Sequence, residues 1–71
     1  AIDLPRLPER EQEILALLAQ GHSNKTIAAR LYLSVRTVEG HLASLYARLG
    51  VHSRTEAALL AVQIGLSPQI R

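Results

Sequence analysis

The sequence predicts an all-α fold of four helices, and three observations point to it. Apolar residues recur at intervals of three and four, the spacing of one face of an α-helix. Serines suited to capping a helix and glycines suited to ending one fall between the apolar runs. The 71-residue chain has no Phe, Met, Trp or Cys, so Leu, Ile, Val and Ala must form its core. We expect helices at residues 8–20, 24–31, 35–49 and 54–64, in one domain spanning 8–65 between a lead-in at 1–7 and a tail at 66–71.

The first predicted helix comes after an extended lead-in, because Pro5 disfavours helix at the residue before it. Its apolar face consists of Ile14, Leu15, Leu17 and Leu18. Glu9 and Glu11 lie in the first turn, where carboxylates complement the helix dipole, and Gly21 ends the helix. No Ser, Thr, Asp or Asn caps its start. Glu11 and Glu13 stand on opposite sides of the helix, so they do not form a catalytic pair. We interpret these carboxylates as part of a solvated acidic face.

The second predicted helix is short and leads directly into the third. Ser23 can cap it, and its inward stripe consists of Ile27, Ala28 and Leu31. The segment 32–34 then makes a tight connection. Two helices joined by three or four residues form a helix-turn-helix motif, which we place at about 24–43.

The third predicted helix has a marked start and stop and two contrasting faces. Ser34 can cap its first turn, and Gly50 stands where a left-handed residue would end it. Its apolar stripe consists of Val35, Val38, Leu42, Leu45 and Leu49, and its outer face of Arg36, Glu39, Gly40, Ala43 and Ala47. A capped helix with so slim an outer face can enter a groove.

The fourth predicted helix begins with a capping box, Ser53 with Glu56 three residues later. Residues 57–64 are apolar nearly all round the helix, and one face alone can seal the core. The remaining surface favours a dimer contact over small residues tolerated in water. We expect that contact at Ala58, Ala61, Val62 and Gly65.

Charge is divided unevenly along the chain. Residues 1–20 carry a net charge of −2 and residues 21–71 a net charge of +4, which together give the formal +2. A basic segment indicates a polyanionic partner, although a solvated basic surface would look the same. No apolar run is long enough to span a membrane and no signal-peptide pattern is present, so we expect a cytoplasmic protein without a membrane partner. The first residue is Ala rather than Met, which favours a processed chain or a domain of a longer protein.

Double-stranded DNA is the polyanion that these helices fit. The third helix would place its N-terminal half in the major groove, with the second across the backbone. Glu39 is unusual there because it repels phosphate: it either accepts a hydrogen bond from a cytosine amino group or pairs with Arg36 three residues before it. The expected DNA-contacting residues are Lys25, Thr26, Arg30, Ser34, Arg36, Thr37, Glu39, Gly40, His41, Ala43, Ser44 and Arg54.

Other functions have weaker signals in the sequence. His22, His41 and His52 are spaced 19 and 11 residues apart, which matches no metal-ligand pattern, and no nucleophile–base pair is evident. We therefore expect no metal, no cofactor and no catalytic residue. The main rival function is a protein-docking module that uses the apolar fourth helix. An RNA-binding function is disfavoured because only Tyr32 and Tyr46 could stack on bases, and Tyr46 is better placed in the core.

Four blocks of the sequence carry a resemblance to a known family. They are L-P-E-R-E-Q-E-I-L-A-L-L-A-Q-G at 7–21, S-N-K-T-I-A-A-R-L at 23–31, S-V-R-T-V-E-G-H-L at 34–42 and L-G-V-H-S-R-T-E-A at 49–57. Together they resemble the LuxR-type (NarL/FixJ-like) helix-turn-helix output domain of bacterial transcription regulators. The resemblance implies that the third helix reads the major groove, that the fourth often mediates dimerisation, and that Lys25, Thr37 and His41 contact the DNA backbone. In that family the domain either follows a receiver or ligand-sensing domain, as in the response regulators of two-component systems, or stands alone. The missing Met favours an attached N-terminal domain here.

The chain departs from the family pattern at several positions. Residues 8–9 are Pro-Glu where the family has Thr or Ser and then Pro. Glu39 stands where many members carry Lys, and Gly40 and Ala43 replace longer side chains, so the resemblance does not give the operator sequence. Tyr32 stands in the turn where Gly is frequent, so a left-handed conformation there would carry strain.

Overall fold

The computed structural model describes residues 7–65, which form four α-helices and contain no strand. The helices are α1 (Glu9–Ala19), α2 (Asn24–Leu31), α3 (Val35–Leu49) and α4 (Arg54–Gln63). The all-α prediction is confirmed, and the predicted bounds differ only by one residue at each end of α1 and at the end of α4. The predicted tail at 66–71 and all but the last residue of the predicted lead-in lie outside the described residues.

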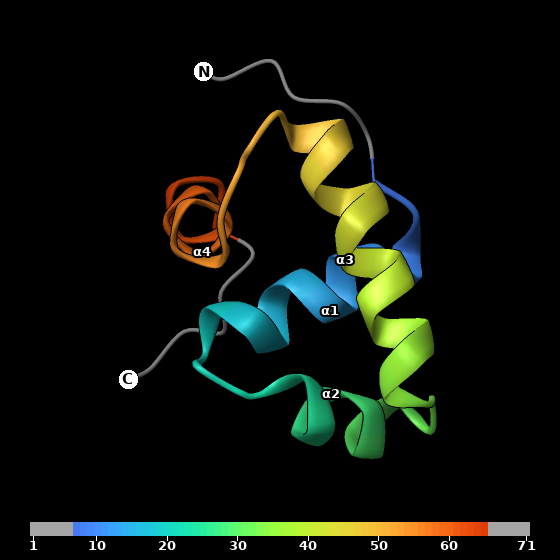
Figure 1. Cartoon of the computed structure of the whole chain (residues 1–71). Helices are drawn as coiled ribbons and strands as arrows, with labels where there is room; N and C mark the ends of the chain where they lie inside the picture. Colours follow the sequence, from blue (N-terminus) through green and yellow to red (C-terminus); the bar gives the residue numbers. More distant parts are fainter. Residues whose placement is uncertain (1–6, 66–71) are drawn as a thin grey trace.

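Helix α1 is the central element, and the other three helices all pack against it. Figure 1 shows α4 on one side of α1 and α3 on the other, with α2 packed against α3. The helix-turn-helix pair α2–α3 and the fourth helix are therefore held together mainly through α1. This arrangement leaves the outer side of α3 uncovered by any described helix.

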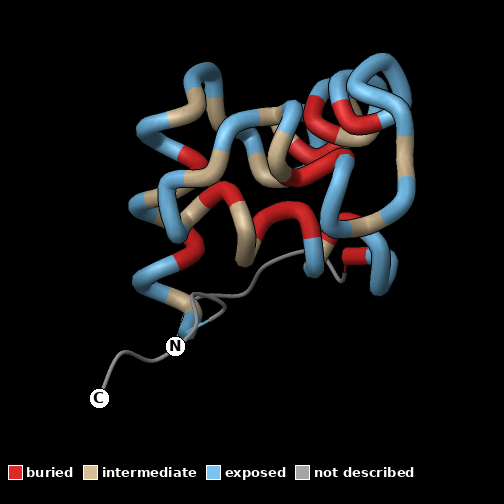
Figure 2. Tube along the Cα trace, turned by 90° about the horizontal axis from the view of Figure 1, so that it is seen from below, coloured by how far each residue is buried: buried red, intermediate tan, exposed pale blue. Residues whose placement is uncertain are grey.

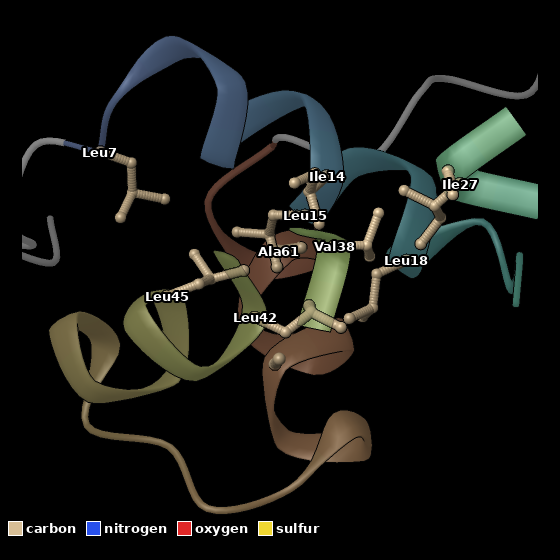
Figure 3. Packing of buried hydrophobic residues seen from close by; sticks show 11 residues of the cluster. Leu7, Ile14, Leu15, Leu18, Ile27, Val38, Leu42, Leu45 and Ala61 are labelled. Atoms are coloured by element: carbon tan, nitrogen blue, oxygen red, sulfur yellow. The ribbon is translucent and has the colours of Figure 1, made fainter. Parts of the chain in front are cut away.

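The core lies between the helices and receives side chains from all four of them. Figure 2 marks the buried residues along the chain trace. Figure 3 shows Leu15, Leu42 and Leu45 converging between α1 and α3. The buried apolar residues are Leu7, Ile14, Leu15, Leu18, Ile27, Ala28, Val38, Leu42, Leu45, Ala57 and Ala61. Val35, which we expected in the apolar stripe of α3, is 38% exposed. The buried stripe begins one turn later, at Val38, because Val35 is the first residue of the helix and lies beyond the packed core.

Serine side chains cap the N-termini of α2, α3 and α4, as the sequence predicts. The hydroxyls of Ser23, Ser34 and Ser53 accept hydrogen bonds from the backbone N–H three residues ahead, at 3.2, 3.0 and 3.1 Å. The capping box of α4 differs from the expected form, because the carboxylate of Glu56 accepts from the N–H of His52 at 2.6 Å, one residue before the cap. Pro8 precedes α1 and provides no side-chain cap, also as expected.

The connection between α2 and α3 depends on a residue in the left-handed conformation. Tyr32 has φ 59° and ψ 41°, and its backbone N–H donates to the carbonyl of Ala28. Leu33 N–H donates to the same carbonyl at 2.8 Å. Tyr32 is 95% exposed, so its side chain supplies no packing that would offset the strain we expected there.

Candidate nucleic-acid interface

The N-termini of α2 and α3 are built in the same way. In each, the capping serine also donates its hydroxyl hydrogen to a threonine: Ser23 to Thr26 Oγ1 at 3.2 Å, and Ser34 to Thr37 Oγ1 at 2.9 Å. A hydroxyl has one hydrogen to donate and two lone pairs to accept with. Thr26 and Thr37 therefore accept from serine, and their own O–H hydrogens meet no acceptor among residues 7–65.

At both sites, a basic residue stands between the serine and the threonine in the sequence. Lys25 and Arg36 are each the second residue of their helix, are exposed, and form no ion pair with any residue of 7–65. The free N–H groups of a helix N-terminus carry partial positive charge, which the cation reinforces. The pattern Ser-x-Lys/Arg-Thr therefore occurs twice, and this repetition is a signal that the sequence itself contains.

The outer face of α3 is exposed and small, as predicted. Glu39, Gly40, Ala43 and Ala47 are all exposed, whereas Ser44 is half-buried. Apart from its chain neighbours and the backbone of α3 itself, no atom lies within 4 Å of the place where a Cβ on Gly40 would stand. No other part of the described chain therefore requires glycine there. The predicted alternative in which Glu39 pairs with Arg36 is wrong, because this ion pair is not formed.

Glu11 is not part of a solvated acidic face, contrary to our expectation. Glu11 is only 4% exposed, because α3 packs over that side of α1. Arg48 Nε lies 3.3 Å from Glu11 Oε1, and His41 Nδ1 lies 3.9 Å from Glu11 Oε2. Oε1 accepts no hydrogen bond of good geometry despite the short distance, so we regard the contact with Arg48 as electrostatic. The cluster connects α3 to α1.

His41, which we expected to contact DNA, is half-buried and lies against α1 through Glu11. Its place in the middle of α3, one residue after Gly40, leaves its role in DNA contact a prediction.

Arg54 is positioned by the protein itself. Its Nη1 donates to Asn24 Oδ1 at 2.8 Å, and its Nη2 donates to the backbone carbonyl of His22. The guanidinium thus joins the start of α4 to the start of α2, across about 30 residues of sequence. A side chain used in this way is a structural tie, so the structure adds no support to the prediction that Arg54 contacts DNA.

The four residues predicted to form the dimer contact differ in how far they are exposed. The prediction that Ala61 forms part of this contact is wrong, because Ala61 is 0% exposed and belongs to the core of its own chain. Ala58 is half-buried against the core, while Val62 is 60% exposed and Gly65 is exposed. The predicted contact omits Leu59, which is 59% exposed, although it lies three residues before Val62 and so on the same side of the helix.

Two other properties of residues 7–65 bear on function. They contain no group of three or more His, Cys, Asp or Glu side chains placed to hold a metal ion. None of their helices is long and apolar enough to cross a membrane.

Comparison with known proteins identifies one family. The model of the family described as "Bacterial regulatory proteins, luxR family" matches residues 5–61. Among solved structures, the transcription factor GerE is similar, with a TM-score of 0.77 and 35% identity over 87% of this chain and 92% of that chain.

Curated relatives carry names that refer to transcription. The chain is 52% identical over 58 residues to a putative HTH-type transcriptional regulator, YhjB, of Escherichia coli, covering 82% of this chain and 29% of YhjB. It is 46% identical over 65 residues to an uncharacterized transcriptional regulatory protein, YhcZ, of Bacillus subtilis, covering 92% of this chain and 30% of YhcZ. It is 42% identical over 60 residues to the response regulator protein VraR of Staphylococcus aureus, covering 84% of this chain and 29% of VraR. The chain thus spans less than a third of the length of these relatives.

Proposed function

The chain belongs to the luxR family of bacterial regulatory proteins, and from this premise we propose that it binds double-stranded DNA sequence-specifically as the output domain of a transcription regulator. In this proposal α3 lies in the major groove and α2 lies across the backbone, the docking geometry of a helix-turn-helix. The observation that carries the proposal is the pair of matching helix N-termini, each with an exposed cation and a threonine that retains its hydroxyl hydrogen.

These N-termini fit phosphate groups for a physical reason. A phosphate oxygen accepts hydrogen bonds, and it is stabilised by backbone N–H groups and the dipole at a helix N-terminus. Lys25 and Arg36 add full positive charges beside those dipoles. Between phosphates contacted by α2 and α3, the slim outer face of α3 can approach the base edges, where sequence is read.

The first experiment is a titration of the chain with mixed-sequence duplex DNA at several salt concentrations, monitored by fluorescence anisotropy. We expect affinity to fall steeply with salt, because bound cations release the counterions of the phosphates. In Lys25→Ala, the slope of log affinity against log salt should become shallower by about 0.9, the contribution of one phosphate contact.

Arg10→Ala is the matched control for this variant. Arg10 is an exposed cation of α1 that pairs with Glu13 at 3.2 Å, away from the N-termini of α2 and α3. Its removal should leave the salt slope unchanged. Equal changes in both variants would mean that net charge alone, rather than a contact at α2, governs binding. Absence of binding at low salt by the folded chain would instead favour the protein-docking function.

We further propose that the chain dimerises through α4, with Leu59 and Val62 at the centre and Ala58 and Gly65 beside them. Large apolar side chains left exposed on one side of a helix favour association. Val62→Glu should weaken self-association by at least about tenfold without unfolding the monomer, because a carboxylate would be desolvated in the interface. Analytical ultracentrifugation measures this, with and without a DNA carrying two half-sites.

Gln63→Glu adds the same charge at the neighbouring exposed position of α4. It should leave self-association nearly unchanged. If Val62→Glu associates as strongly as the original chain, α4 is not the interface.

The longer relatives extend the proposal to the whole protein. We propose that a receiver or ligand-sensing domain is attached to this chain in the complete regulator, and that the regulator acts in the cytoplasm, where bacterial DNA lies.

A further inference from the structure

Glu39 is an acidic side chain on the face of α3 that the proposed function places against DNA. It is exposed, and it forms no ion pair with any residue of 7–65. A carboxylate on such a surface opposes binding, because it repels every phosphate nearby. Its presence at this position therefore requires a compensating interaction.

Residues 7–65 supply no such interaction. The first turn of α3 is already capped, since the N–H of Thr37 donates to Ser34 at 3.0 Å. Glu39 is the fifth residue of the helix, beyond the first turn, where carboxylates benefit from the helix dipole. Because Glu39 is exposed, its side chain does not belong to the hydrophobic core either.

The donors and acceptors on the base edges limit which bases can form a hydrogen bond with a carboxylate. An ionised carboxylate only accepts hydrogen bonds. In the major groove, guanine presents two acceptors and thymine presents an acceptor and a methyl group. Adenine presents an amino donor beside the N7 acceptor, whereas cytosine presents its N4 amino donor alone. Cytosine is therefore the base that a carboxylate matches without meeting an acceptor of the same base.

The surroundings of Glu39 allow that approach. Gly40 has no side chain, and open space lies where its Cβ would stand. Ala43, one turn further on, has only a methyl group. Arg36, one turn before Glu39 and likewise without an ion pair among residues 7–65, lies toward the capped N-terminus. No long side chain of the outer face lies next to Glu39 on its C-terminal side.

We propose that Glu39 accepts a hydrogen bond from the N4 amino group of a cytosine and so specifies a C·G pair at one position of each half-site. This inference rests on the proposed function and adds the identity of one base to it. Selectivity arises chiefly against the wrong bases: opposite guanine or thymine, the carboxylate loses its water and gains no donor.

The test is a selection from a random-sequence duplex library with three proteins: the original chain, Glu39→Ala and Glu39→Gln. Affinities are then measured by anisotropy on duplexes that differ only at the position in question. The original chain should enrich cytosine there and bind the three other pairs roughly tenfold more weakly. Glu39→Ala should lose the preference and bind the non-cytosine duplexes more tightly. Glu39→Gln should shift the preference toward adenine, whose N6 and N7 a glutamine amide can contact together.

Glu13→Gln is the matched control, because it removes the same charge from an exposed residue of α1. It should keep the cytosine preference. If the original chain and Glu39→Ala enrich the same bases at every position, the inference fails while salt-dependent DNA binding, and with it the proposed function, stands. If the folded chain binds no DNA at low salt, the proposed function fails and this inference fails with it.

Discussion

Tyr32 holds a backbone conformation that residues with a side chain rarely adopt, at φ 59° and ψ 41°. The left-handed region costs such a residue about 1–2 kcal/mol, and the 95% exposed ring of Tyr32 makes no packing contact that would offset this cost. The conformation persists because the turn between α2 and α3 has to bring two packed helices together over three residues.

Tyr32→Gly should therefore raise the free energy of unfolding. We expect a gain of about 0.5–1 kcal/mol. Glycine relieves the left-handed strain, but it also raises the entropy of the unfolded chain, which offsets part of the gain. Urea denaturation monitored by circular dichroism measures it.

Gly50→Ala is the reverse comparison at the end of α3. Gly50 is also left-handed, at φ 69°, and apart from its chain neighbours no atom lies within 4 Å of an added Cβ, so the cost would be conformational only. That variant should lose about 1 kcal/mol. A loss of stability in Tyr32→Gly would mean that the tyrosine ring contributes a contact in solution that outweighs the strain.

At the scale of elements, the three serine caps are alike in geometry but differ in the side chain that each one meets. Ser34 and Ser23 each donate to a threonine, whereas the carboxylate of Glu56, three residues after Ser53, turns back to the N–H of His52. The caps of α2 and α3 are therefore suited to an external anion, and the cap of α4 is closed by the protein's own carboxylate.

Ser34→Ala and Ser53→Ala separate these two roles. Each should lower the free energy of unfolding by about 1 kcal/mol, the usual loss of a serine cap. Ser34→Ala alone should also weaken DNA binding several-fold, because Thr37 loses the partner that orients its hydroxyl. Denaturation and anisotropy on the same samples provide both quantities. Equal DNA affinity in the two variants would remove the Ser34–Thr37 pair from the proposed contacts.

At the scale of the whole molecule, α4 depends on α1 for its packing and on Arg54 for its link to α2. The hydrogen bonds of Arg54 to Asn24 and to the carbonyl of His22 join the start of α4 to the start of α2. A small domain has a thin margin of stability, so a tie between distant segments has a large effect.

Arg54→Gln should lower the free energy of unfolding by about 1.5–3 kcal/mol, the range for hydrogen bonds to a charged group. The salt slope of DNA binding by the folded fraction should stay unchanged, because Arg54 is engaged by the protein itself. Unchanged stability together with a shallower salt slope would restore the prediction that Arg54 binds DNA.

The sequence by itself determined the helices and their ends, because these depend on local interactions. Capping by Ser23, Ser34 and Ser53, the stop at Gly50 and the left-handed position at Tyr32 each involve residues within four positions of one another. The small exposed face of α3 results from the same periodicity. The family resemblance rested on these local patterns and is confirmed by the comparisons.

Only the tertiary structure decided which of the predicted surface side chains are buried or bound by the protein itself. Glu11 and Ala61 are buried because another helix covers them, and Arg54 is engaged by residues about 30 positions away. Glu39, which the sequence offered as either a base contact or a partner of Arg36, forms no ion pair within residues 7–65. Periodicity says which residues share a face of a helix, but the crossing of one helix over another decides which face is covered. Burial and long-range contacts are therefore properties of the packed molecule rather than of any one segment.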